Sequence, residues 1–291
     1  MSSAHHAEQA QLWNGPAGHA WVDMQASLDR LFRPLEDLLV DAVVTASPGG
    51  RVLDVGCGTG ATTLAIARLH GAQRRCTGLD ISAPMIAAAR TRAEREDIAP
   101  PHFICANAQT HAFEPDSFDM IVSRLGVMFF DDPVRAFANL RHAARDGAQL
   151  RFIAWRSAAE NPFMTTAERA AAPLLPHLPA RQPGAPGQFA FADRQRVQAL
   201  LEASGWDGID IRPIDVACVL PEQDLLAYLS RLGPVGLALQ TADEATRADV
   251  IATVRAAFEA FVHGDEVRLT AACWMVGARA PAAPGKAADH D

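Results

Sequence analysis

The spacing of apolar residues separates a helical first part of the chain from an alternating middle part. From Gln9 to Val44, leucine and phenylalanine recur at every third or fourth position, which predicts a largely helical segment. A Ser-Pro-Gly-Gly sequence at 47–50 interrupts it. Short apolar runs typical of buried strands follow, and we expect five strands, over Arg51–Val55, Arg75–Leu79, His102–Cys105, Phe118–Ser123 and Gln149–Trp155.

Stretches of helical periodicity lie between these apolar runs. Three helices are expected there, over Ala61–His70, Pro84–Glu96 and Pro133–Arg145. An alternation of strands and helices predicts a mainly parallel sheet covered by helices, because each crossover between parallel strands needs a connecting element. The pattern therefore predicts an α/β fold.

After Trp155 the alternation stops. A helical stretch and the Pro/Gly-rich segment Pro179–Gly187 occupy Asn161–Ala192, which we interpret as an insertion or lid. The expected remaining elements are a helix over Asp193–Ser204, a strand around Ile209–Val219, helices near Asp224–Leu232 and Ala242–Val262, and a strand over Val267–Ala278. The Ala/Pro/Gly-rich tail beyond them is expected to be disordered.

Composition restricts the class of protein. Apolar residues make up 49% of the chain and charged residues 21%, with a net charge of −8, so a nucleic-acid partner is not expected. No apolar run is long enough for a membrane span, and no secretion signal is recognisable. The five cysteines are widely separated and form no C-x-x-C pair, so neither a disulfide framework nor a metal site is expected. These features predict a cytoplasmic protein with a small-molecule substrate; homodimerisation stays open.

The segment Asp54–Gly60 (DVGCGTG) is the most informative motif. An apolar strand with an acid near its end runs into a glycine-rich turn and then into a helix. Glycines at alternate positions allow a sharp turn and a close approach to a ligand, while the helix N-terminus offers free N–H groups. The candidate binding residues here are Asp54, Gly56, Cys57, Gly58 and Gly60.

A dinucleotide-binding turn is the alternative interpretation, because Gly56, Gly58 and Ala61 also satisfy G-x-G-x-x-A after a strand. The carboxylate of Asp54 favours a different ligand, since it would attract the ammonium of a methionine group and repel a pyrophosphate. An oxidoreductase of the short-chain type is disfavoured, because the single tyrosine, Tyr228, is followed four positions later by Leu232 and the single lysine, Lys286, lies in the tail.

Asp80 is the second marker, at the end of the second expected strand. It follows the glycine turn by about 20 residues, the distance at which an acid can accept both ribose hydroxyls. A purely structural role is the alternative, because Asp80 and Ser82 precede a helix and could cap it. In the ligand-binding interpretation, Ile81 and Met85 offer apolar faces to an adenine ring.

These motifs together resemble motifs I and II of class I S-adenosylmethionine-dependent methyltransferases. Ala106–Thr110 (ANAQT), Phe118–Phe130 and Trp155 resemble the branch that contains the ubiquinone/menaquinone-biosynthesis C-methyltransferases. The resemblance implies a Rossmann-like seven-stranded sheet with an antiparallel last strand and a helical cap. It also implies S-adenosyl-L-methionine as methyl donor and S-adenosyl-L-homocysteine as product.

The resemblance implies roles for further residues. Asn107 and Ala108 would contact the adenine edge, Ser123 and Arg124 would line the methionine end, and Trp21 would close over the cofactor. Relatives commonly carry aspartate where Asn107 stands, so the adenine amine would lose a charge-assisted hydrogen bond.

The resemblance also divides the chain into five predicted parts. They are an N-terminal helical lid (1–48), a cofactor-binding core (49–156), a helical insertion with a returning helix (157–206), C-terminal strands with a helical insertion that complete the sheet (207–279) and a disordered tail (280–291).

A catalytic base is optional for methyl transfer from a sulfonium, because the leaving group is already activated and alignment provides much of the rate. His111 is the best-placed candidate base, with a surface histidine as the alternative. The apolar residues of the insertion favour a hydrophobic or aromatic acceptor, methylated on carbon, oxygen or nitrogen. A nicotinamide-dependent oxidoreductase and a non-catalytic cofactor-binding protein are the rival functions.

Overall fold

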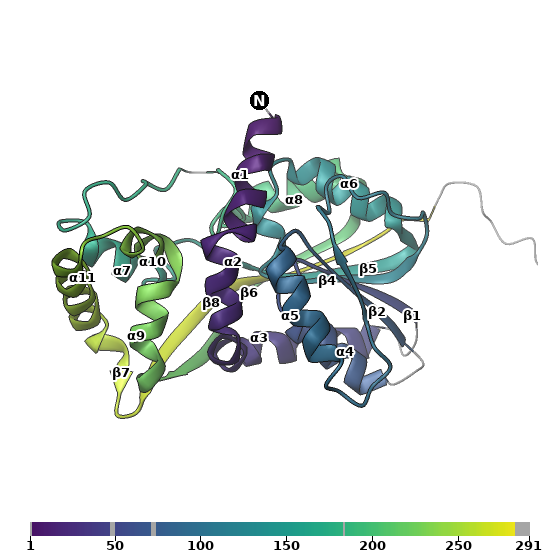
Figure 1. The fold of residues 1–291 in the computed structure, drawn as a ribbon. Coiled ribbons are helices and arrows are strands. Elements are labelled where there is room, and N and C mark those ends of the chain that lie inside the picture. Colours follow the sequence, from purple (N-terminus) through teal and green to yellow (C-terminus); the bar gives the residue numbers. More distant parts are fainter. Residues whose placement is uncertain (1, 47–49, 71–73, 183, 283–291) are drawn as a thin grey trace, which may run out of the picture.

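The computed structural model describes residues 2–46, 50–70, 74–182 and 184–282. Its centre is one sheet with the strand order β3-β2-β1-β4-β5-β8-β6, and β7 pairs with β8 (Figure 1). The strands are β1 (Gly50–Val55), β2 (Arg74–Asp80), β3 (His102–Cys105), β4 (Phe118–Arg124), β5 (Ala144–Trp155), β6 (Asp207–Pro221), β7 (Val262–His263) and β8 (Glu266–Arg279).

Strands β1 to β5 are parallel, and β8 runs antiparallel to both β5 and β6. This arrangement confirms the expected Rossmann-like sheet with an antiparallel last strand. The two-residue strand β7 is an addition to the seven expected strands, and it forms a short hairpin with the beginning of β8.

Helices cover both faces of the sheet (Figure 1). Helices α3 (Gln25–Ala46), α4 (Ala61–His70) and α5 (Ala83–Ala93) lie on one face, and α6 (Pro133–Ala143) and α8 (Arg194–Ala203) pack together on the other. The helical periodicity correctly located these elements because each places an apolar stripe on the sheet. Helix α6 ends two residues before the expected Arg145, since Ala144 already pairs with Phe118 as the start of β5.

The N-terminal segment is helical, as expected, and consists of three helices. They are α1 (Ser2–Asn14), α2 (Pro16–Asp23) and α3, with breaks at Gly15 and Met24. Pro16 has no backbone N–H to donate, so a helix restarts at this residue more easily than it continues through it.

Four helices, α7 (Phe163–Ala171), α9 (Glu222–Arg231), α10 (Gly233–Leu239) and α11 (Glu244–Ala257), pack against one another at one end of the molecule (Figure 1). We call this group the cap. The expected helix Ala242–Val262 is shorter, because it ends at Ala257 and a 3-10 turn, Glu259–Phe261, leads into β7. A second 3-10 turn, Val127–Phe129, follows β4.

The last strand, β8, ends at Arg279. The next residue, Ala280, is fully buried, donates a hydrogen bond to the carbonyl of Ala148 at 2.9 Å and accepts one from Gly147 at 2.8 Å. Most of the predicted disordered tail, 283–291, lies outside the described residues. Within the described part of the chain, no helix is both long and apolar enough to cross a membrane.

Candidate cofactor and acceptor site

The glycine turn between β1 and α4 is held against the two neighbouring strands. The N–H groups of Gly56 and Cys57 donate to the carbonyl of Leu79 in β2, at 2.8 and 3.1 Å. Gly56 has a φ of +68°, and a Cβ atom on it would lie 2.7 Å from the Cα of Gly126, in the loop after β4. A side chain at this position would push the turn away from that loop, so the sequence needs glycine here.

Asp80 fastens the same turn from the end of β2. One carboxylate oxygen accepts a hydrogen bond from the N–H of Gly58 and the other from the N–H of Ser82, both at 2.8 Å. Burial raises the pKa of Asp80, while these N–H groups act against the rise. The side chain that caps α5 is that of Ser82, which accepts from Met85, so capping by Asp80 itself is not its role.

Asp54 lies behind the glycine turn and does not line a cavity. Asp54 as a whole is 2% exposed, and its Oδ2 atom accepts a hydrogen bond from the hydroxyl of Thr63 at 2.6 Å. Its Oδ1 atom is buried and has no hydrogen-bond partner among the described residues. Burial raises the pKa of Asp54 to about 6, although Thr63 and the guanidinium of Arg124 oppose the rise.

A cavity of about 440 Å³ begins at this turn and extends beneath the cap. Ten of the predicted cofactor-binding residues line it: Trp21, Gly56, Cys57, Gly58, Asp80, Ile81, Met85, Asn107, Ala108 and Arg124. The fold therefore brings together residues from the N-terminal helices and from the ends of four strands, as the sequence motifs predict. Asp54, Gly60 and Ser123 are the three that do not line the cavity.

Two of these three residues support the turn. Gly60 leaves room for the ring of Phe103, which would lie 3.1 Å from an added Cβ atom. Ser123 is fully buried; its hydroxyl donates to the carbonyl of Val55 at 2.7 Å and accepts from Gly126 at 3.2 Å.

The amide oxygen of Asn107 is already engaged within its own loop. It accepts a hydrogen bond from the N–H of Gln109 at 2.8 Å, which closes a local turn after β3. Arg124 likewise donates to the hydroxyl of Thr62 and to the carbonyl of Phe32, so its guanidinium is fixed between α3 and α4.

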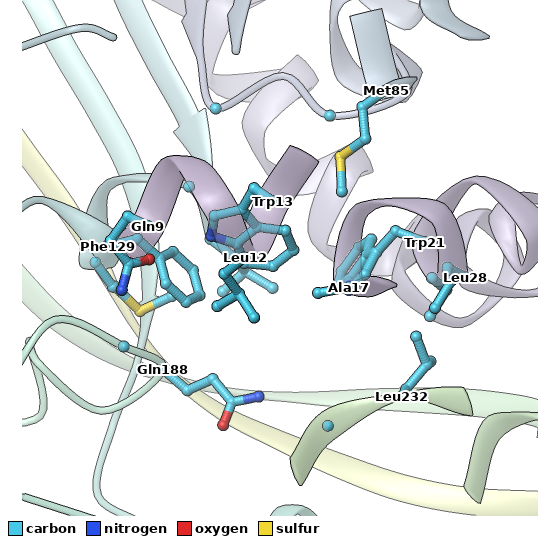
Figure 2. A pocket seen from close by; sticks show the side chains of 18 of the residues that line it. Gln9, Leu12, Trp13, Ala17, Trp21, Leu28, Met85, Phe129, Gln188 and Leu232 are labelled. Atoms are coloured by element: carbon cyan, nitrogen blue, oxygen red, sulfur yellow. The ribbon is translucent and has the colours of Figure 1, made fainter. Parts of the chain in front are cut away.

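The N-terminal helices form one wall of the cavity (Figure 2). Trp13, Trp21 and Leu28 lie in a row there, with Met85 on one side of the row and Gln188 and Leu232 on the other. The edge of Trp13 packs on Phe129 at a ring distance of 5.1 Å. Gln9 also lines this wall, and its Oε1 atom is buried without a hydrogen-bond partner in the described part of the chain.

Polar contacts fix this wall to the turn after β2. The carbonyl of Trp13 accepts from the Ser82 hydroxyl at 2.6 Å. The side chain of Asn14 donates to the carbonyl of Ile81 at 3.0 Å and accepts from the N–H of Ala83 at 2.8 Å. These contacts join residues nearly 70 positions apart and leave no pattern in the sequence by which they could have been predicted.

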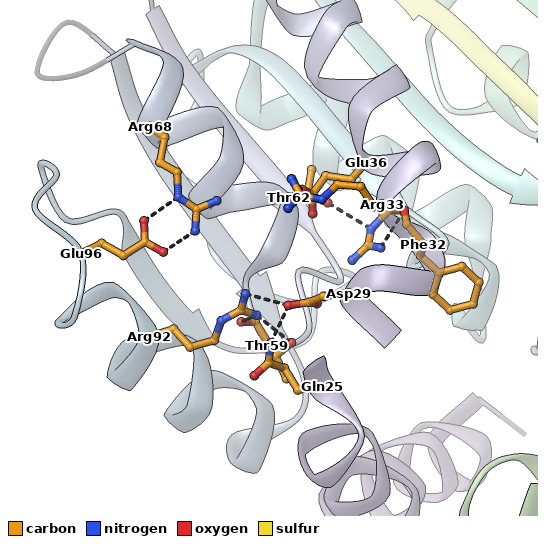
Figure 3. Close-up of polar contacts among 11 residues, drawn as sticks. Gln25, Asp29, Phe32, Arg33, Glu36, Thr59, Thr62, Arg68, Arg92 and Glu96 are labelled. Carbon is orange, nitrogen blue, oxygen red and sulfur yellow. Dashed lines mark hydrogen bonds and ion pairs between the residues drawn. The ribbon is translucent and has the colours of Figure 1, made fainter. Parts of the chain in front are cut away.

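A second polar cluster joins α3 to the glycine turn (Figure 3). Arg92 of α5 forms an ion pair with Asp29 at 2.8 Å and donates to the carbonyl of Thr59, also at 2.8 Å. Further out, Arg68 and Glu96 form an ion pair that connects α4 with the chain after α5. The inner cluster touches residues that line the cavity, and the outer pair does not.

The wall at the cap is mainly apolar and aromatic. Its members include Phe32, Met128, Trp155, Phe163, Leu229, Val235 and Phe258. Polar groups enter at two places. Glu168, Arg181 and Gln188 bind one another, with Arg181 Nε 2.9 Å from Glu168 and Arg181 Nη1 3.0 Å from Gln188. The other place is α9, where Tyr228 and Arg231 line the cavity, and no motif identified Tyr228.

His111 does not line the cavity. Its ring packs edge-on against Phe113 at 4.6 Å, on the surface near α6. No histidine is among the described residues that line the cavity, so the geometry favours the alternative interpretation of His111 as a surface residue.

Comparisons with known proteins agree with this arrangement. A family profile described as a methyltransferase domain matches residues 52–147. Aklanonic acid methyltransferase DauC from Streptomyces sp. (strain C5) is 32% identical over 168 residues, which are 55% of this chain and 76% of that protein. Demethylmenaquinone methyltransferase from Renibacterium salmoninarum is 27% identical over 186 residues, 61% of this chain and 75% of that protein.

The solved structure of YcgJ from Bacillus subtilis is similar in fold. It superimposes with a TM-score of 0.56 at 15% sequence identity and covers 85% of this chain and 98% of its own. At this identity the likeness concerns the arrangement of helices and strands alone.

Proposed function

The chain belongs to the class I S-adenosylmethionine-dependent methyltransferases, and on that premise we propose that it methylates a small hydrophobic or aromatic acceptor held beneath the cap. The observation that carries the proposal is the single cavity that joins the glycine turn to an apolar and aromatic wall. S-adenosyl-L-methionine is the cofactor and S-adenosyl-L-homocysteine the product.

The residues around the turn fit this cofactor. We assign Asp80 to the ribose hydroxyls, because each of its oxygens has accepted one N–H and retains a lone pair for a hydroxyl. Ile81 and Met85 would pack on the adenine, and Asn107 and Ala108 would meet its edge. The remaining assigned contacts are Gly56, Cys57, Gly58 and Gly60 at the turn, Ser123 and Arg124 at the methionine end, and Trp21 in the lid.

The orphan oxygen of Asp54 supports a positively charged ligand. An ionised carboxylate so deeply buried is costly unless a cation lies nearby, and Arg124 alone leaves the pKa raised. We assign Asp54 to the ammonium of the methionine group, on which it acts from behind the glycine turn.

The chain's own contribution to the reaction is alignment and exclusion of water. When bound, S-adenosyl-L-methionine supplies a methyl group on a positively charged sulfur, so an in-line approach of the acceptor is the main requirement. The aromatic wall from Phe32, Trp155 and Phe163 would hold a flat acceptor in such a line, and the N-terminal helices would keep water out.

The names of the two relatives support the proposed class of acceptor, and the composition of the chain supports the proposed compartment and the absence of a nucleic-acid partner. The relatives are named for aklanonic acid and for demethylmenaquinone, so we place the acceptor among small organic molecules. The net charge of −8 supports the absence of a nucleic-acid partner, and the free cysteines support a reducing compartment such as the cytoplasm.

Calorimetric titration with S-adenosyl-L-homocysteine and with NAD tests the cofactor, and labelled S-adenosyl-L-methionine with a panel of phenols, quinols and aromatic amines tests the transfer. We expect S-adenosyl-L-homocysteine to bind with a Kd in the micromolar range, and we expect the labelled methyl group to appear in a methylated aromatic product. Binding of NAD alone would contradict the proposal. Cofactor binding with no transfer to any compound would favour a non-catalytic protein.

A further inference from the structure

Tyr228 stands out in the apolar wall at the cap. Its neighbours in the cavity lining include the apolar residues Leu229, Leu232 and Val235, together with Arg231. Its hydroxyl forms no hydrogen bond with any residue in the described ranges. Tyr228 is half-buried and its hydroxyl opens onto the cavity, so an oxygen of a bound ligand can become its hydrogen-bond partner in place of solvent.

Contacts at both ends of α9 hold Tyr228 in place. Asp224 accepts hydrogen bonds from Ser27 at 2.7 Å and from Arg30 at 2.8 Å, and Arg231 forms an ion pair with Asp23 at 3.3 Å. Residues 224, 228 and 231 are spaced by four and by three, so they share one face of the helix. That face is directed at the N-terminal helices, which form the opposite wall of the cavity.

The Tyr228 hydroxyl belongs to the same cavity as the glycine turn, where the methyl donor would lie. Burial, and then the neighbouring Cys218, raise the pKa of Tyr228 to about 12. Because it keeps its proton at neutral pH, it can donate a hydrogen bond but cannot serve as a base.

We propose that the Tyr228 hydroxyl donates a hydrogen bond to an oxygen of the acceptor, and that the site thereby selects oxygen-substituted aromatic molecules over bare aromatic hydrocarbons. This inference rests on the proposed function, because it takes the turn end of the cavity as the cofactor's place. It adds a specific polar contact in the part of the wall where Leu229, Leu232 and Val235 lie.

A comparison of two ligands and two proteins tests the contact. The proteins are the wild type and Tyr228→Phe, both saturated with S-adenosyl-L-homocysteine, and the probes are 2-naphthol and naphthalene in equilibrium dialysis. In Tyr228→Phe we expect the Kd of 2-naphthol to rise about tenfold, the effect of one net hydrogen bond, and the Kd of naphthalene to change less than twofold. The Kd of S-adenosyl-L-homocysteine for Tyr228→Phe should be within twofold of its Kd for the wild type.

Three outcomes would overturn the inference. An unchanged Kd of 2-naphthol would show that the hydroxyl makes no such contact, and an equal loss for both probes would show that Tyr228 only packs. Absence of saturable 2-naphthol binding to the wild type would exclude this acceptor class. Failure of S-adenosyl-L-homocysteine to bind the wild type would instead contradict the proposed function.

The wild-type protein alone keeps the inference testable if Tyr228→Phe does not fold. In that case 2-naphthol should bind the wild type about tenfold more tightly than 2-fluoronaphthalene, which has a similar shape and a far weaker hydrogen-bond acceptor. Equal affinity for these two probes would overturn the inference.

Discussion

The hydroxyl of Thr63 donates a hydrogen bond to Oδ2 of Asp54 at 2.6 Å, while the other carboxylate oxygen, Oδ1, is buried and has no hydrogen-bond partner among the described residues. The pair lies behind the glycine turn, where the pKa of Asp54 is raised to about 6. A carboxylate in this state gains when a cation is bound on the other side of the turn. Two predictions follow from it.

Asp54→Asn should weaken binding of S-adenosyl-L-homocysteine about 10- to 100-fold, because the ligand's ammonium loses its buried counter-charge. In the wild type, the Kd should rise by up to about tenfold per unit as the pH falls below about 6, since the proton on Asp54 must leave before the cation binds. Calorimetric titration between pH 5 and 8 measures both effects.

Thr63→Val is the matched control for this charge. It removes the hydroxyl and keeps the carboxylate, so it should weaken binding less than Asp54→Asn and move the pH dependence upward, because Thr63 lowers the pKa. A folded Asp54→Asn protein with wild-type affinity at pH 8 would refute the role of Asp54.

Stability should depend on the same group in the opposite sense. The pKa of Asp54 is about 6 in the folded protein against an ordinary value of 3.8, so the folded state binds the proton more tightly than the unfolded chain. Its stabilising contribution is fully present below about pH 4 and is lost as the pH rises through 6. Asp54→Asn should therefore be more stable than the wild type by up to about 3 kcal/mol at pH 8 and similar to it near pH 4. Urea unfolding without ligand at the two pH values is the measurement, and an Asn variant that is less stable at pH 8 would contradict the sign.

Asp80→Ala should impair both folding stability and binding. The change leaves the N–H groups of Gly58 and Ser82 without their carboxylate acceptor. Each of these groups that stays buried should lower the free energy of unfolding by about 1–3 kcal/mol. Loss of the ribose contacts should weaken S-adenosyl-L-homocysteine binding about 100-fold. The comparison is Ser82→Ala, which removes the α5 cap and the hydrogen bond to the Trp13 carbonyl, lowers the stability by about 1 kcal/mol for the cap, and keeps the Asp80 carboxylate, so it should weaken binding much less. Equal loss of affinity in the two variants would remove the special role of Asp80.

Arg92→Ala should loosen α3 from the glycine turn. It breaks the ion pair with Asp29 and the hydrogen bond to Thr59, both at cavity-lining residues, so the Kd of S-adenosyl-L-homocysteine should rise about three- to tenfold. Arg68→Ala removes the neighbouring pair with Glu96, which is outside the cavity lining, and should leave this Kd within twofold (Figure 3). Similar effects of both changes on the measured Kd would show that only general helix packing is involved.

The strand and helix pattern predicted the sheet because its signals are local. The apolar run of β1, the glycines after it and Asp80 at the end of β2 each determine their own backbone, and parallel pairing then brings Asp80 to the glycine turn. Helix α10 was not predicted, since it has only seven residues and two of them, Gly233 and Gly236, are glycines, which are weak helix formers, so contacts within the cap decide its conformation.

Side-chain positions in the site depended on contacts between distant segments. Asp54 was expected beside the ligand, yet Thr63 of α4 holds it one layer behind the turn. Tyr228 carries no motif at all, and it reaches the cavity because Asp224 and Arg231 fasten α9 to helices about 200 positions earlier in the chain. Such long-range pairs leave no periodic signal in a single sequence.

The cap is built from segments inserted between strands, with α7 between β5 and β6 and α9 to α11 between β6 and β8. The glycine turn, Asp80 and the loop after β3 all belong to the first half of the chain. Mutations in the cap can therefore change which methyl acceptor binds, while the residues assigned to the cofactor in the first half of the chain stay the same. This separation lets descendants of one ancestral gene diversify their chemistry of recognition without rebuilding the machinery that they share.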